Sequence, residues 1–99
     1  MMLLNDSRID VNAKDDREGA TPLHLAAGRG HSNIVECLLA DERVDVLAAT
    51  EHGDHPIHEA AQSGDLKSVR LLANDPRVDL HAINMDNERA VDVAEVEVV

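Results

Sequence analysis

The stretch Thr21-Pro22-Leu23-His24-Leu25-Ala26-Ala27 returns 34 residues later as His55-Pro56-Ile57-His58-Glu59-Ala60-Ala61. A weaker third copy, Arg-Ala-Val-Asp-Val-Ala-Glu, occupies residues 89–95. Flanking residues keep the same step, as Gly30 and Gly64 do. A fixed period of this length is typical of repeat proteins, in which one small unit is stacked on the next. The sequence therefore predicts a solenoid and not a single closed globule.

Each copy carries the signals of two short helices. Thr21 is a favourable N-cap, and Pro22 takes the first helical position, where a missing N–H costs nothing. Gly30 ends this inner helix, because glycine readily adopts the left-handed backbone that follows many helices. Apolar residues then recur at the spacing of an outer helix with one buried face: Ile34, Val35, Leu38 and Leu39. The second copy repeats this plan, with an inner helix over 56–63 and Asp65 as the next cap.

The turns before the inner helices also share a register. Gly19 and Gly53 take equivalent positions ahead of their helices, and Asn87 stands there in the third unit. Asparagine is a common substitute for glycine where φ must be positive. The substitution therefore supports the same alignment of the three units.

The repeated pattern resembles the ankyrin repeat. Besides the stretch at 21–27 and its copy at 55–61, the resemblance rests on Asp10-Val11-Asn12-Ala13-Lys14-Asp15, which is similar to the hairpin signature of that family. It covers essentially all 99 residues. The resemblance implies an all-α, ankyrin-type solenoid of helix pairs connected by β-hairpins. It also implies that His24 and His58 hydrogen-bond the backbone of adjoining hairpins and so tie neighbouring units together.

The register predicts one domain over 1–99 with two complete repeats, at 11–45 and 46–79. Partial units are expected at 1–10 and 80–99. The apolar residues Val96, Val98 and Val99 suit the exposed end of a solenoid poorly. Two interpretations stay open: a fragment of a longer array, or a minimal protein that self-associates or binds a partner through its uncapped ends.

Composition excludes several classes of function. The net charge is −11, from 20 acidic against 9 basic side chains, and there is no Phe, Tyr or Trp. Such a chain repels nucleic-acid phosphates and anionic membranes, and it lacks aromatic rings on which bases could stack. We therefore expect neither a nucleic-acid nor a membrane partner, and we expect a protein partner with a basic surface.

The single cysteine, Cys37, excludes an internal disulfide framework. A reducing location, the cytoplasm or the nucleus, is therefore expected. Because Cys37 lies next to Leu38 on an apolar helix, we expect its thiol to be buried and inert.

No catalytic or cofactor site is expected. The spacing of His52, His55 and His58 invites a zinc interpretation, but the repeat register places them on a tip, a cap and a helix, so their side chains should diverge. Neither a nucleophile elbow nor a phosphate-binding glycine loop is present. A non-enzymatic protein without metal or cofactor is predicted.

The ankyrin resemblance implies that a concave face, made by the hairpin tips and inner helices, binds another protein. Carried over position by position, the predicted contact residues are Arg17, Glu18, Ala20, Arg29, Glu51, His52, Asp54, Gln62, Ser63, Met85, Asp86 and Glu88. Glu59 stands where the first copy has Leu25, so it adds charge to this face. The alternatives are a structural spacer that binds nothing itself, and a solvated acidic face that only maintains solubility.

Overall fold

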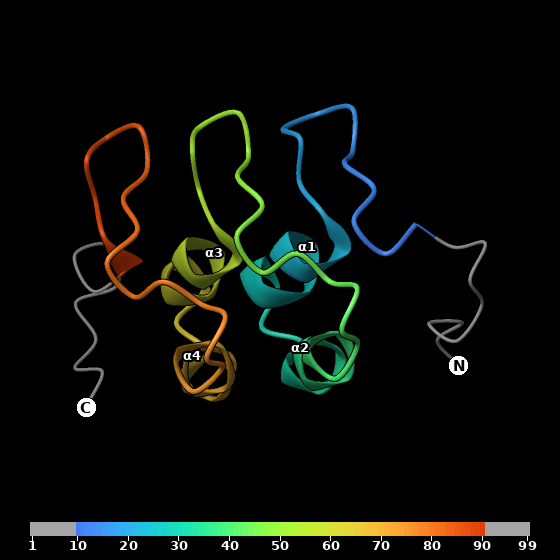
Figure 1. Cartoon of the computed structure of the whole chain (residues 1–99). Helices are drawn as coiled ribbons and strands as arrows, with labels where there is room; N and C mark the ends of the chain where they lie inside the picture. Colours follow the sequence, from blue (N-terminus) through green and yellow to red (C-terminus); the bar gives the residue numbers. More distant parts are fainter. Residues whose placement is uncertain (1–9, 91–99) are drawn as a thin grey trace.

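The computed structural model describes residues 10–90, which form two stacked helix pairs connected by long loops (Figure 1). Four helices are present in this part: α1 (Pro22–Gly28), α2 (Ser32–Leu39), α3 (Pro56–Ser63) and α4 (Leu66–Ala73). The inner helix α1 packs against α3, and the outer helix α2 packs against α4. The inner-helix boundary predicted at 56–63 is confirmed.

Equivalent residues of the two repeats occupy equivalent places in the core. Leu23 in α1 and Ile57 in α3 are both buried, at 1% and 4% exposure. The core that includes the packed helices α1 and α3 contains four of their alanines: Ala26, Ala27, Ala60 and Ala61. Because these side chains are small, the inner helices can approach closely, and each layer covers the apolar flank of its neighbour.

Three loops project side by side from the same edge of the helices (Figure 1). The β-hairpins expected here are not confirmed, since residues 10–90 contain no strand. Each loop is instead closed at its base by a backbone hydrogen bond, for example from the Asp15 N–H to the Ala20 carbonyl at 2.9 Å, and the second and third loops each contain one further turn bond. These bonds close turns and do not form a ladder of paired residues.

A side-chain oxygen at the start of each loop holds the loop in shape. The oxygens belong to Asp15, Thr50 and Asn84, and each accepts two backbone N–H groups from its own loop. The two bonds to Asp15 lower the pKa of its carboxyl. Near the end of each loop one turn residue has a positive φ. These residues are Gly19, Gly53 and Asn87, and the value at Asn87 is 63°, as predicted. Three different residue types thus hold their loops with the same kind of bond, although the first loop is one residue longer than the other two.

The motif histidines connect the layers, as the resemblance implied. His24 Nε2 lies 2.8 Å from the Asp54 carbonyl, and His58 Nε2 lies 2.9 Å from the Glu88 carbonyl. Because a carbonyl only accepts, Nε2 carries the hydrogen in both rings, and Nδ1 is left to accept a bond within its own layer. Neighbouring loops are also joined directly, by the Glu51 N–H donating to the Glu18 carbonyl at 2.9 Å.

Arg77 connects the layers on the outer-helix side. Its guanidinium pairs with Asp75 at 2.9 Å, which lowers the pKa of that carboxyl. It also donates to the Leu39 carbonyl at 2.8 Å and to the Val44 carbonyl at 3.3 Å, both in the preceding repeat. Carbonyls in the last turn of a helix have no partner within the helix. Arg77 therefore satisfies the end of α2 from the next layer.

The prediction that Cys37 is buried is wrong, because its side chain is exposed. Successive residues of a helix point in different directions, so a position beside Leu38 does not share its face. Val35 and Leu38 form the buried face of α2. Residues 1–9 of the partial unit predicted at 1–10 and the apolar segment at 91–99 lie outside the described residues.

The two inner helices differ at their N-caps, and this difference gives a prediction. Thr21 Oγ1 lies 2.8 Å from His24 Nδ1 and accepts the His24 N–H. His55 has almost the same backbone, with φ −84° and ψ 162° against −88° and 168° at Thr21, but its side chain caps nothing. Its buried Nδ1 has no hydrogen-bond partner among the described residues. We expect His55→Thr to raise the free energy of unfolding by about 1 kcal/mol, measured by urea denaturation.

The matched control for this change is Thr21→Val, which removes the N-cap hydroxyl of α1 in the first repeat. It should lower the free energy of unfolding by about 1 kcal/mol. A His55→Thr protein no more stable than the wild type would show that the two caps are not equivalent.

Burial of His24 and His55 predicts a loss of stability in mild acid. Burial is the main cause that lowers the pKa of each ring below its ordinary value of 6.5. The unfolded chain therefore binds a proton before the folded chain does, so stability is complete above pH 6.5 and falls as the pH drops below it. The measurement is the free energy of unfolding from pH 7.5 to 5. His55→Thr should make this dependence shallower, and an unchanged dependence would exclude His55 as a contributor.

Candidate functional site

The loop tips and inner helices present a row of accessible side chains. Most of the predicted contact residues are exposed: Arg17, Glu18, Arg29, Glu51, His52, Gln62, Ser63, Met85 and Asp86. Met85 is the most open large apolar residue of the described chain, at 75% exposure. Glu88 is half-buried, and its carboxylate accepts a bond from Asn84 Nδ2 at 3.1 Å.

Two of the predicted contact residues are corrected by the structure. Ala20 and Asp54 are buried, at 5% and 8% exposure, so neither presents a side chain at a tip. Ala20 lies at the base of its loop, bonded to Asp15. The Asp54 carboxylate accepts a bond from Asn84 Nδ2 at 2.9 Å, so it faces the next layer and not a partner.

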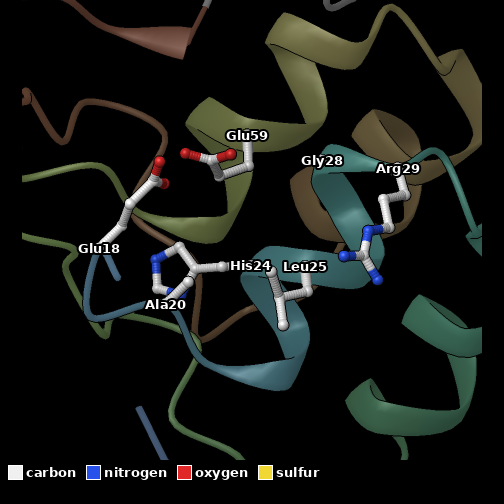
Figure 2. Close-up of a pocket in the computed structure, with 7 residues that line it drawn as sticks. All are labelled: Glu18, Ala20, His24, Leu25, Gly28, Arg29 and Glu59. Carbon is white, nitrogen blue, oxygen red and sulfur yellow. The ribbon is translucent and has the colours of Figure 1, made fainter. Parts of the chain in front are cut away.

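A shallow hollow of about 190 Å³ lies between the first loop, α1 and α3. Its lining consists of Glu18, Ala20, His24, Leu25, Gly28, Arg29 and Glu59 (Figure 2). This volume is below the roughly 300–1,000 Å³ of a typical small-molecule pocket. Its size suits one side chain of a partner better than a metabolite.

Two carboxylates stand on one wall of the hollow. In Figure 2 the side chains of Glu18 and Glu59 point toward one another, while the Arg29 guanidinium lies on the opposite side of the hollow from Glu18 and is directed toward Leu25. Burial raises the pKa of Glu59, and the negative charges of Asp54 and Glu18 raise it further. Glu59 lies close over Gly28, since a Cβ added at Gly28 would be 3.1 Å from Glu59 Oε2.

The carboxylates of Glu18 and Glu59 form no ion pair with a basic side chain of residues 10–90. The ion pairs seen between described residues, Arg43–Asp41 and Arg77–Asp75, both lie in the segments that follow the outer helices. Neither Glu18 nor Glu59 is in an ion pair or accepts a side-chain hydrogen bond from residues 10–90. The surface therefore keeps its negative charge available.

The titratable side chains of the described residues do not gather into a metal-binding cluster. No group of three His, Cys, Asp or Glu side chains in residues 10–90 is arranged to hold a metal ion. Both ring nitrogens of His24 are occupied by structural hydrogen bonds, so this ring is not free to move a proton.

Leu25 lines the hollow, although it was not among the predicted contact residues. Its side chain is 37% exposed and forms an apolar part of the hollow, beside the carboxylate that replaces it in the next repeat. The signal was present in the alignment of the two copies, because both residues occupy one position of the motif. Nothing in the sequence pattern indicated that Glu18 and Glu59 would line the same hollow.

Comparison with known proteins agrees with this architecture. The family model of ankyrin repeats in three copies matches residues 1–84. The chain has no match among the curated proteins. No helix within residues 10–90 has the length and apolar character needed to span a bilayer. With a match over most of its length, this chain belongs to the ankyrin repeat family, whose members are generally protein–protein interaction modules.

Proposed function

We propose that this protein is a non-catalytic binding module, and that its partner is a protein held against the loop tips and inner helices. The observation that carries the proposal is the row of exposed side chains on successive layers, from Arg17 and Glu18 through Glu51 and His52 to Met85. Loop-to-loop and histidine hydrogen bonds hold these tips in fixed positions. A preorganised surface loses less conformational entropy when it binds.

Charge supports a partner with a basic surface. Three exposed residues at the tips are acidic: Glu18, Glu51 and Asp86. Arg17 is an exposed basic residue on the same surface. Attraction between complementary surface charges is screened by salt, with a Debye length of about 8 Å at physiological ionic strength. The association should therefore weaken as salt is raised, mainly through a slower on-rate.

The test is capture of a partner by the wild-type protein, followed by substitution of the tips. The variant Arg17→Ala/His52→Ala/Met85→Ala should lose the same captured protein, with affinity reduced at least tenfold, since a few central residues dominate most interfaces. Affinity is measured with the identified partner in purified form.

The matched control is Glu36→Ala/Lys67→Ala/Arg70→Ala, which changes three exposed residues of the outer helices. It should bind as the wild type does. Equal binding by both variants would contradict a contact through the loop tips.

A second candidate function, a structural unit that stacks end to end on further repeats, is favoured by one observation. Val46 is 4% exposed, whereas its equivalent Leu80 is 43% exposed and Ile83 is 52% exposed. These apolar side chains on the last described layer would be covered by another layer, from a longer array or from a second copy.

Sedimentation velocity tests this second candidate. If the end face self-associates, the sedimentation coefficient should rise with protein concentration, and Leu80→Glu/Ile83→Glu should abolish the rise. A monomer at every concentration, with or without these substitutions, would contradict self-association through this face.

The proposed location is intracellular, in the cytoplasm or nucleus. It is supported by the single cysteine, which is free and exposed, and therefore suits a reducing compartment.

A further inference from the structure

The hollow beneath the first loop combines an apolar floor with two unneutralised carboxylates. Glu18 comes from the loop and Glu59 from α3, so the two acids belong to different repeats and meet only in the stack. Leu25 and Gly28 lie on α1 beside them. The long aliphatic stem of a lysine or arginine packs well on apolar surface while its charged head reaches a polar group.

The negative charge of Glu59 is unfavourable at this position unless a positive charge lies close to it. Glu59 is half-buried, the negative charges of Asp54 and Glu18 act against its ionised form, and His52 is a weaker opposing influence. No Lys or Arg of residues 10–90 forms an ion pair with it. The preceding repeat has Leu25 at the same position, so the fold itself does not require an acid there. A cation from outside would offset the cost of holding this charge.

The other end of the hollow fixes the direction of an occupant. The Arg29 side chain is exposed and lies across the hollow from Glu18, with its guanidinium directed toward Leu25 (Figure 2). Its positive charge repels a second cation and attracts a carbonyl or carboxylate. The lining therefore favours an occupant that is positive at the Glu18–Glu59 end and not at the Arg29 end.

We propose that this hollow receives one arginine or lysine side chain of the partner protein, with its cationic head between Glu18 and Glu59 and its stem on Leu25 and Gly28. The inference rests on the proposed binding function and names the anchor of that contact. The protein has no aromatic side chain that could act as the central anchor of an interface. A cationic side chain of the partner, held in the hollow, would take that role.

The test is an NMR titration of the full chain with N-acetyl-arginine methylamide and, separately, N-acetyl-lysine methylamide. Saturable shifts of the Leu25, Gly28 and Glu59 amides are expected with at least one of them, in the millimolar range expected for ligands of this size. The neutral isostere N-acetyl-citrulline methylamide should bind at least tenfold more weakly, because it lacks the charge that the carboxylates attract.

Substitutions locate the binding. Glu59→Gln and Glu18→Gln should each weaken the cationic probe several-fold, while Glu36→Gln, a change of equal charge on the exposed face of α2, should leave it unchanged. The amide spectrum of each variant reports whether the fold is intact. Lowering the pH should weaken binding to the wild type as Glu59 takes up a proton, and this dependence should be smaller in Glu59→Gln.

Three results would overturn the inference: no saturable shift with either cationic probe, equal binding of citrulline, or equal effects of Glu59→Gln and Glu36→Gln. The proposed function is judged separately. A captured partner that is lost with the tip variant but retained by both Glu59→Gln and Glu18→Gln would uphold the binding surface and reject the hollow as its anchor.

Discussion

The hydrogen bond from a motif histidine to the next loop is the interaction on which the arrangement of the surface depends. His24 and His58 are nearly inaccessible, at 1% and 0% exposure, and each reaches a carbonyl 30 residues further along the chain. A buried donor that lost its acceptor would carry the full cost of its desolvation. The loops therefore hold one position relative to the helices, and this position determines where the side chains at the loop tips lie.

Regular repetition makes the departures from it informative. Alanines and leucines recur because each layer must cover its neighbour, and the motif histidines His24 and His58 recur because both bond a backbone carbonyl of the next layer. Glu59 has no such structural reason, since it replaces an apolar residue and raises the local density of negative charge. Positions at which a sequence breaks its own local rule are expected to be functional or strained. This physical distinction separates the hollow from the rest of the surface.

Much of the fold could be predicted from the chain alone. The cap at Thr21, the helix at Pro56–Ser63 and the positive φ of Asn87 follow from local chemistry, and all are confirmed. Predictions that needed knowledge of neighbours were less successful. Cys37 was wrongly expected in the core, and Ala20 and Asp54 were wrongly expected at the surface. Whether a tip side chain is free depends on whether the adjacent layer bonds to it, and no local pattern encodes that.

The sequence by itself determined the family, the period of the repeat and the places where helices begin and end, because these depend on residues close together in the chain. The tertiary structure decided which acids meet. Glu18 and Glu59 come from different repeats, and only the stacking distance and direction bring their carboxylates to one wall beside Leu25. Contacts between layers are set by packing of the whole stack, so the charge and shape of the hollow emerge only when the layers are assembled.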